Sequence, residues 1–225
     1  PADQRLPEGG GYTVSGFSNL DPTALTRPGD NFATLDKNFG EQTEVWNGVD
    51  VGVNARLGSG LFLQGGTSTG RTVTDNCEIV AVLPEVSPTG APYCHEVQNW
   101  LTQVKGLASY TTPRIDVSVA GTYQYLPGPA ISANWVVSTT SSAVQGLGRP
   151  LTGGNQTINL LEPSTEYGAG LNQLDLRLAK ILRFGTTRTM VSLDIYNATN
   201  ANTVLTHNNT FSPTATNAWL AKATS

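Results

Sequence analysis

LNQLDLRLAKILRFGTTRTMVSLDIYNATNANTVL, residues 171–205, is the stretch that decides the fold. Leucines alternate with polar residues over 173–178, and the alternation returns over 191–196. A period of two is typical of a β-strand with one apolar face. The connection at 184–188 is short and contains glycine, as hairpin loops do. These residues therefore predict one long antiparallel hairpin.

The same alternation occurs in four earlier segments, which we predict to be long strands. They cover residues 45–57, 61–74, 99–110 and 115–125. The prolines within 126–129 should break the ladder, because proline donates no backbone hydrogen bond, and the strand should resume over 131–137. Shorter predictions are a helical turn at 21–25 and a short strand at 157–161. The sequence predicts an all-β chain, a long antiparallel meander.

Strand length bears on which environment the apolar face meets. Soluble strands usually run about 5 to 6 residues, whereas a tilted membrane strand needs roughly 9 to 11. The predicted connections also alternate, with short turns at 58–60, 111–113 and 185–187 and long polar loops at 75–98 and 138–170. Outer-membrane β-barrels have this asymmetry between their two ends, so we expect a meander of the outer-membrane β-barrel type.

Three segments resemble a known family. LDLRLAKILRFGTTRTMVSLDIYNATNANTVLTHNNTF (174–211) is similar to the late barrel strands of TonB-dependent outer-membrane receptors, particularly those that carry a carboxypeptidase-regulatory-like N-terminal domain. FGEQTEVWNGVDVGVNARL (39–57) and GGTSTGRTVTDNC (65–77) resemble the same family. The resemblance implies a non-catalytic wall of a nutrient transporter in the bacterial outer membrane. The C-terminus lacks the aromatic closing residue usual in such barrels.

Composition excludes some partners. The formal net charge is −4, and no cluster of lysine and arginine is present, so we expect no nucleic-acid partner. Apolar runs are too short for a membrane-spanning helix of roughly 18 residues. Charged residues make up 13%, against about 25% in soluble domains.

Cys77 and Cys94 are the only cysteines, and both lie in the polar loop at 75–98. In an exported chain this arrangement predicts a disulfide that ties the loop. The loop-entropy estimate for such a bond is about 3 kcal/mol. The alternative is two free thiols.

Several charges fall in the polar phase of the predicted strands, where a barrel would direct them into its lumen. The predicted lumen-facing charges are Asp50, Arg56, Lys105, Asp116, Asp175, Arg177 and Asp194. We interpret them as structural pairs, with a transport or ligand role as the alternative. Tyr110, Tyr123, Tyr125 and Phe184 are candidates for aromatic girdles at the membrane surfaces.

No residue pattern predicts catalysis, a cofactor or a metal. Residues 66–70, GTSTG, match the letters of a hydrolase nucleophile elbow, but the predicted strand continues through them, whereas that motif needs a strand-to-helix turn. His95 and His207 have no metal-ligand spacing, and we expect each to be a solvated loop histidine.

We therefore expect a single β-barrel segment over 1–225, with an N-terminal loop region (1–40), barrel strands and loops (41–206) and a C-terminal tail (207–225). The chain begins at Pro1 without a signal segment, which favours a processed precursor or an excerpt. Six strands cannot close a receptor-sized barrel, so the sheet edges need partners: missing strands of a longer chain, or other copies of itself. The alternative function is a processed extracellular subunit that self-assembles into a filament or oligomer.

Overall fold

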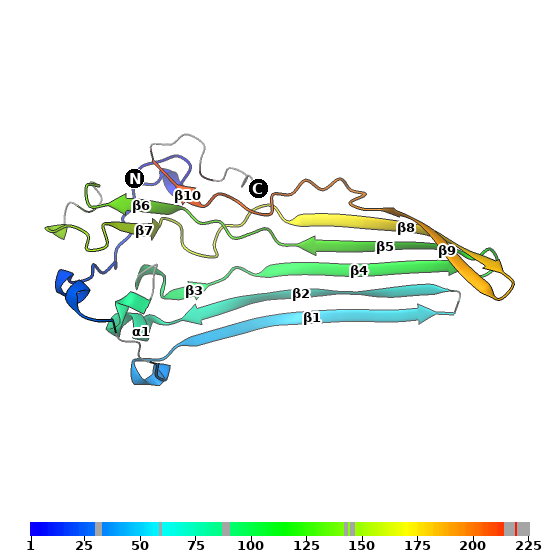
Figure 1. The fold of residues 1–225 in the computed structure, drawn as a ribbon, viewed down its shortest axis with the longest axis horizontal. Helices are drawn as coiled ribbons and strands as arrows, with labels where there is room; N and C mark the ends of the chain where they lie inside the picture. The colour runs from blue at the N-terminus through cyan, green and yellow to red at the C-terminus, as the bar shows by residue number, and fades with distance from the viewer. Residues whose placement is uncertain are drawn as a thin grey trace.

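The computed structural model describes residues 1–29, 33–58, 60–86, 91–141, 144, 147–213 and 219. It consists of a long sheet and, at one end of that sheet, a small lobe that contains a second sheet and both ends of the described chain (Figure 1). The helices are short and confined to the lobe end (Figure 1). The all-β prediction is confirmed.

The main sheet is an antiparallel meander in the order β1-β2-β4-β5-β8-β9, with the short β3 beside β2. Its strands are β1 (Thr43–Leu57), β2 (Leu61–Asp75), β3 (His95–Val97), β4 (Leu101–Thr112), β5 (Val117–Leu126), β8 (Leu171–Phe184) and β9 (Thr187–Ile195). Only one side of β1 and one side of β9 pair with another described strand. The sheet is open and does not close into a barrel.

Short turns join the strands at the end of the sheet away from the lobe, which we call the turn end (Figure 1). The backbone there needs left-handed residues: Gly60 has φ 88° and Gly185 has φ 59°. Ser59 of the predicted 58–60 turn lies outside the described residues. The longer connections lie at the opposite end, the loop end, as predicted from the sequence.

The lobe at the loop end contains the remaining elements. They are η1 (Pro7–Gly9), η2 (Pro22–Thr26), η3 (Asp36–Asn38), α1 (Cys77–Val82), η4 (Pro84–Val86), η5 (Ala91–Tyr93), β6 (Asn134–Ser138), β7 (Asn155–Asn159) and β10 (Thr210–Phe211). β6 lies between β10 and β7 in the small sheet. Asp21 caps η2 by accepting a hydrogen bond from the Thr23 backbone, so the predicted helical turn is confirmed as a 3-10 turn.

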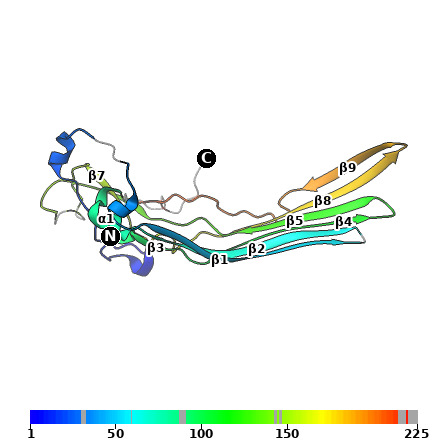
Figure 2. The same cartoon turned by 90° about the horizontal axis from the view of Figure 1, so that it is seen from below.

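Nearly all of the hydrophobic core lies in this lobe. The largest cluster of described buried residues comprises Leu6, Ala133, Leu160, Leu161, Phe211 and Trp219. Among the described buried hydrophobic side chains, Ala179 is the one contributed by the main sheet. Towards the turn end the sheet is a single layer with neither face covered by another element (Figure 2). The main sheet therefore lacks a core of its own.

Several predicted strand boundaries are wrong. The third strand begins at residue 101 and ends at 112, and the fourth begins at 117, so the turn lies at 113–116 instead of 111–113. The last long strand ends at Ile195 instead of Leu205, because Asn197 and Asn200 both adopt positive φ of 52°, which ends an extended ladder.

Three other predictions for the loop end also need correction. The loop predicted at 75–98 holds the helix α1 and the short strand β3, which pairs with β2. The strand predicted to resume at 131 is β6 at 134–138, and it joins the small sheet instead of extending β5. The short strand predicted at 157–161 is β7, Asn155–Asn159. Within the predicted tail 207–225, Phe211 and Trp219 pack in the lobe core; residues 214–218 and 220–225 lie outside the described part.

Candidate functional site

The strand register sorts the main-sheet side chains onto two chemically different faces. Directly opposed residues on antiparallel strands point to the same side. One row therefore runs through Ala55, Leu63, Ala108, Gly121, Leu176 and Ile195. We call the side that contains this row the apolar face, and the opposite side the polar face.

The apolar face carries an exposed hydrophobic band across the main sheet. Its exposed members include Val49, Val51, Val53, Leu57, Val119, Tyr123, Leu176, Leu178, Val191, Leu193 and Ile195. Val49 is 64% exposed and Leu193 is 62% exposed. A continuous patch of exposed apolar side chains of this extent is unusual on a soluble monomer. At ~3.4 Å per residue, the band runs about 27 Å along β1 from Val49 to Leu57.

The polar face carries most of the charges predicted from the sequence. By register and alternation, six of the seven lie there: Asp50, Arg56, Lys105, Asp175, Arg177 and Asp194. Glutamines, serines and threonines fill much of the remaining surface, interrupted by Trp46, Phe62, Leu107, Ile181 and Met190. For these six charges, the alternation in the sequence and the strand register in the structure agree that they lie on one face.

Asp116 is the exception, and its assignment to a strand was wrong. It lies in the turn before β5 with φ 53°, and both carboxylate oxygens accept hydrogen bonds from Arg183, at 2.9 and 2.7 Å. This hydrogen bonding lowers the pKa of Asp116 below its ordinary value. Lys180 donates to the backbone oxygen of Ile115, so β8 clamps the turn through two cations.

Two groups of contacts organise the charges on the polar face. Arg177 donates two hydrogen bonds to Asp194 across β8 and β9. Asp175 accepts from the Gln173 amide at 2.9 Å and from the backbone nitrogen of Asn197 at 2.7 Å. The second contact fixes the chain where β9 ends. Arg177 and Asp194 are thus the two predicted charges that pair with each other among the described residues. Asp175 bonds uncharged groups instead.

A hollow of about 490 Å³ opens on the polar face over β2, β4, β5 and β8. Gln64, Lys105, Gln124, Gln173 and Asp175 line it, and Gly66 has no side chain to fill it. Gln124 donates to Gln173 at 3.1 Å. Lys105 forms no ion pair with the described residues, so its ammonium group is available to an anionic or polar solute in the hollow.

Trp46 is a residue of this face that the sequence reasoning did not single out. A Cβ placed on Gly48 would lie 2.3 Å from its ring, and a Cβ on Gly70 would lie 2.5 Å from it. The indole therefore lies flat over two glycines on neighbouring strands. The ring can approach the backbone this closely only because both positions are glycine, so the two glycines are the sequence signal for this contact.

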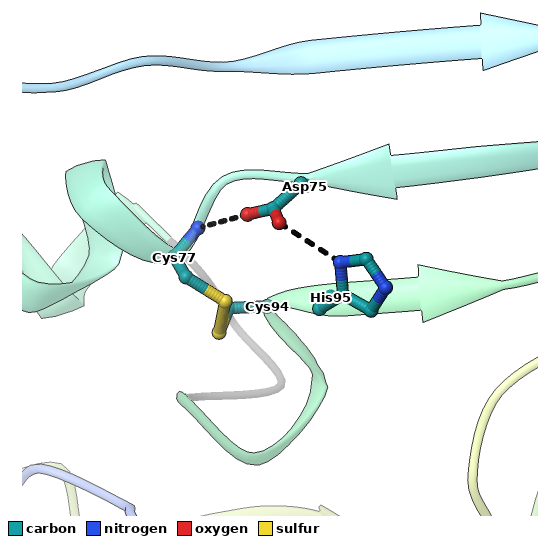
Figure 3. The surroundings of a disulfide bond; sticks show 4 residues. All are labelled: Asp75, Cys77, Cys94 and His95. Atoms are coloured by element: carbon teal, nitrogen blue, oxygen red, sulfur yellow. Dashed lines mark hydrogen bonds and ion pairs between the residues drawn. A yellow bond between two sulfur atoms is a disulfide. The ribbon is translucent and has the colours of Figure 1, made fainter.

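The predicted disulfide between Cys77 and Cys94 is present, with the two Cα atoms 4.7 Å apart (Figure 3). It joins the start of α1 to the start of β3. Asp75 accepts from the Cys77 backbone at 3.0 Å and lies 2.8 Å from the His95 ring nitrogen. The two hydrogen bonds lower the Asp75 pKa, with the backbone bond the larger cause. His95 is half exposed, as predicted, but it lies in β3 and pairs with Asp75, so the predicted loop position was wrong.

The second histidine also differs from expectation. Both ring nitrogens of His207 are buried without a hydrogen-bond partner, and the ring packs against Gly168. Neither histidine joins a cluster of three or more potential metal ligands within the described residues. Ser68 of the GTSTG segment lies in the middle of β2, away from any strand-to-helix turn.

None of the described helices is long and apolar enough to span a membrane. Comparison of the chain with protein-family models, curated proteins and solved structures finds no match.

Proposed function

We propose that this chain forms part of the β-barrel wall of a TonB-dependent outer-membrane receptor of the carboxypeptidase-regulatory-like-domain type. Its role is non-catalytic: it separates lipid from a polar transport lumen. The observation that carries the proposal is the segregation of the main sheet into an apolar face and a polar face. Lipid-facing and lumen-facing residues alternate in this way along the strands of membrane barrels.

The alternative of a soluble sheet is less consistent with the packing. A soluble sheet buries its apolar face against another layer, whereas large side chains such as Val49, Val191 and Leu193 are more than half exposed here. Tilted by about 40°, the band of roughly 27 Å along β1 spans about 20 Å across a membrane, which approaches the roughly 25 Å apolar band of outer-membrane barrels. Lipid chains therefore suit this face without any further protein layer.

Neighbouring residues on opposite faces give a direct test. Because the native cysteines are bonded to each other, Val51→Cys and Asp50→Cys each provide a single reactive thiol for a fluorophore. In vesicles that contain spin-labelled lipid, we expect strong quenching at position 51 and little at position 50. Equal quenching at the two positions would contradict the proposal.

The second candidate is a self-assembling extracellular subunit, and the geometry of the edges favours it. The main path has six strands, so β1 and β9 run in opposite directions. A second copy placed in the same orientation therefore brings its β1 antiparallel to β9 of the first. Strand addition of this kind satisfies exposed edge groups. Native mass in detergent distinguishes the candidates, because self-assembly requires multiples of the 23.8 kDa chain.

A further inference from the structure

Just two cations interrupt the apolar face in the described strands of the main sheet, and they lie at opposite ends of its hydrophobic band. Arg71 lies near the loop end, opposite Asn47 on β1. Lys180 lies near the turn end, opposite Val117 and Val191. Lysine and arginine take such positions where an apolar stem meets hydrocarbon and a charged head reaches the polar boundary.

Arg71 differs from Lys180 in having no side-chain hydrogen-bond acceptor among the described residues. Its guanidinium carbon lies 5.4 Å from the centre of the Trp100 ring, and its Nε atom is buried without a hydrogen-bond partner. Lys180 instead donates to the Ile115 carbonyl. Continuing the β2–β4 register by one residue places Trp100 directly opposite Arg71. The guanidinium is thus held against an indole that is 55% exposed, with its donors unused within the described structure.

We propose that Arg71 and Trp100 bind the phosphate of a membrane-lipid headgroup at the loop end of the band. This inference rests on the proposed membrane function. A guanidinium presents parallel N–H donors that match phosphate oxygens. An indole ring favours the boundary between hydrocarbon and headgroups, where one side is apolar and the other is wet.

The surroundings favour a lipid over a free anion. The chain has a formal charge of −4, so its overall field does not concentrate anions. No carboxylate lies on the apolar face between Val45 and Leu57 or in the described rows aligned with them. The uninterrupted part of the hydrophobic band begins at Val49, one row from Arg71 towards the turn end, and a single apolar row, Val45 and Val73, lies on the loop side of Arg71. A lipid gains from both features, because its acyl chains cover the band while its phosphate meets Arg71.

A titration in neutral detergent micelles tests the site on the full chain. Phosphatidic acid is added, and its retention is measured by native mass spectrometry. Arg71→Gln should weaken retention about five- to tenfold, the loss expected for one cation at an anionic headgroup. Arg56→Gln is the matched control, because Arg56 also stacks on a ring, 5.6 Å from that of Phe62, but on the polar face. It should change retention little.

Three outcomes would overturn the inference. The first is equal loss from the two variants, with folding verified by circular dichroism, and the second is no loss from Arg71→Gln. The third is displacement of the lipid by inorganic phosphate at equal concentration, which would indicate a free-anion site. The micelle assay does not require insertion into a bilayer, so failure of the quenching test at positions 50 and 51 remains distinguishable from failure of the Arg71 site.

Discussion

Asp175 and Leu176 are neighbours in the chain and lie on opposite faces of β8. Asp175 has amide and backbone donors around it, whereas Leu176 is partly exposed on a face without nearby carboxylates. The contribution of each side chain to stability therefore depends on whether its face meets lipid or water. To test which medium meets which face, the same charge is introduced once on each face and the two variants are compared.

Leu176→Arg provides this test at the residue scale. In a bilayer the new charge would face hydrocarbon, and we expect the free energy of unfolding to fall by about 2 to 4 kcal/mol. Thr122→Arg, on the polar face opposite Asp175, should have a small effect. Urea unfolding of the two variants in lipid vesicles measures the difference. A greater loss from Thr122→Arg would mean that the faces are assigned the wrong way round.

Asp3 gives a pH-dependent prediction in the lobe. Hydrogen bonds from Arg5 lower the Asp3 pKa from 3.8 to about 2. Arg5 also donates to the Ser212 carbonyl and stacks on Phe211. Because the folded pKa is lower than the unfolded one, the stabilisation is complete above about pH 4 and is lost as the pH falls towards 2.

We therefore expect amide exchange around residues 1–12 to accelerate between pH 4 and pH 2, after correction for the intrinsic exchange rate. Asp3→Asn should already show fast exchange at pH 5 and no further change across this window. Unchanged protection of the native N-terminal segment at pH 2 would show that the Arg5 contact is not what holds it.

At the scale of elements, the disulfide links α1 to β3 at the loop end. Cys94 follows Tyr93, whose hydroxyl donates to the Asn159 carbonyl at 2.8 Å, so the bond also holds a contact between the loop and β7. The cysteines are 17 residues apart. Closing a loop of this size stabilises a fold by roughly 3 kcal/mol through the entropy of the unfolded chain.

Reduction should therefore lower the free energy of unfolding of the lobe by about 2 to 4 kcal/mol, measured by denaturant unfolding with and without reductant. The Cys77→Ser/Cys94→Ser variant should not respond to reductant. Before reduction, the intact mass should show no added alkylating group. Uptake of two such groups by the oxidised native protein would contradict the bond.

The sequence predicted the strands better than their ends. Alternation over 173–178 and 191–196 is a local pattern, and the predicted hairpin formed from it. The end of β9 depends on two asparagines with positive φ and on the Asp175 carboxylate of β8. Alternation within the β9 sequence does not predict either feature. The position of Asp116 likewise depends on Arg183, from another strand. Side-chain partners far apart in sequence thus set the features that the pattern did not predict.

The same reasoning explains which site residues were found. The sequence pattern assigned seven charges to a common face, and the register agrees for six of them, with Asp116 as the exception. Arg71 on β2 contacts Trp100, the residue before β4, and Trp46 on β1 covers Gly70 on β2. Both contacts depend on register, which alternation within one strand does not determine. The disulfide was predictable because only two cysteines were available to form it.

At the scale of the whole molecule, the lobe and the main sheet depend on different sources of stability. The lobe has its own core around Phe211 and Trp219. The main sheet has exposed side chains on both faces and two edges, β1 and β9, that lack an outer partner among the described strands. Backbone N–H and C=O groups at a sheet edge need hydrogen-bond partners wherever water is excluded. In a membrane, lipid would cover the apolar face, but the edges of β1 and β9 would still need neighbouring strands.

This requirement gives the last prediction. If the chain is a section of a larger barrel wall, the 225 residues alone should be monomeric in detergent, and the outward amides of β1 and β9 should exchange far faster than those of β4 and β5. The inner strands are hydrogen-bonded on both sides, whereas each edge strand is bonded on one. Hydrogen exchange followed by mass spectrometry, together with native mass, measures both properties.

Cross-linking of Val53→Cys on β1 to Val191→Cys on β9 separates the remaining possibilities. Both residues lie on the apolar face. A link between two chains, with protected edges and a mass that is a multiple of the single chain, would favour self-assembly over the receptor wall. A link within one chain would mean that six strands close on themselves, against the open order of the sheet. For the receptor section we expect neither link, because the natural neighbours of β1 and β9 are then strands outside these 225 residues.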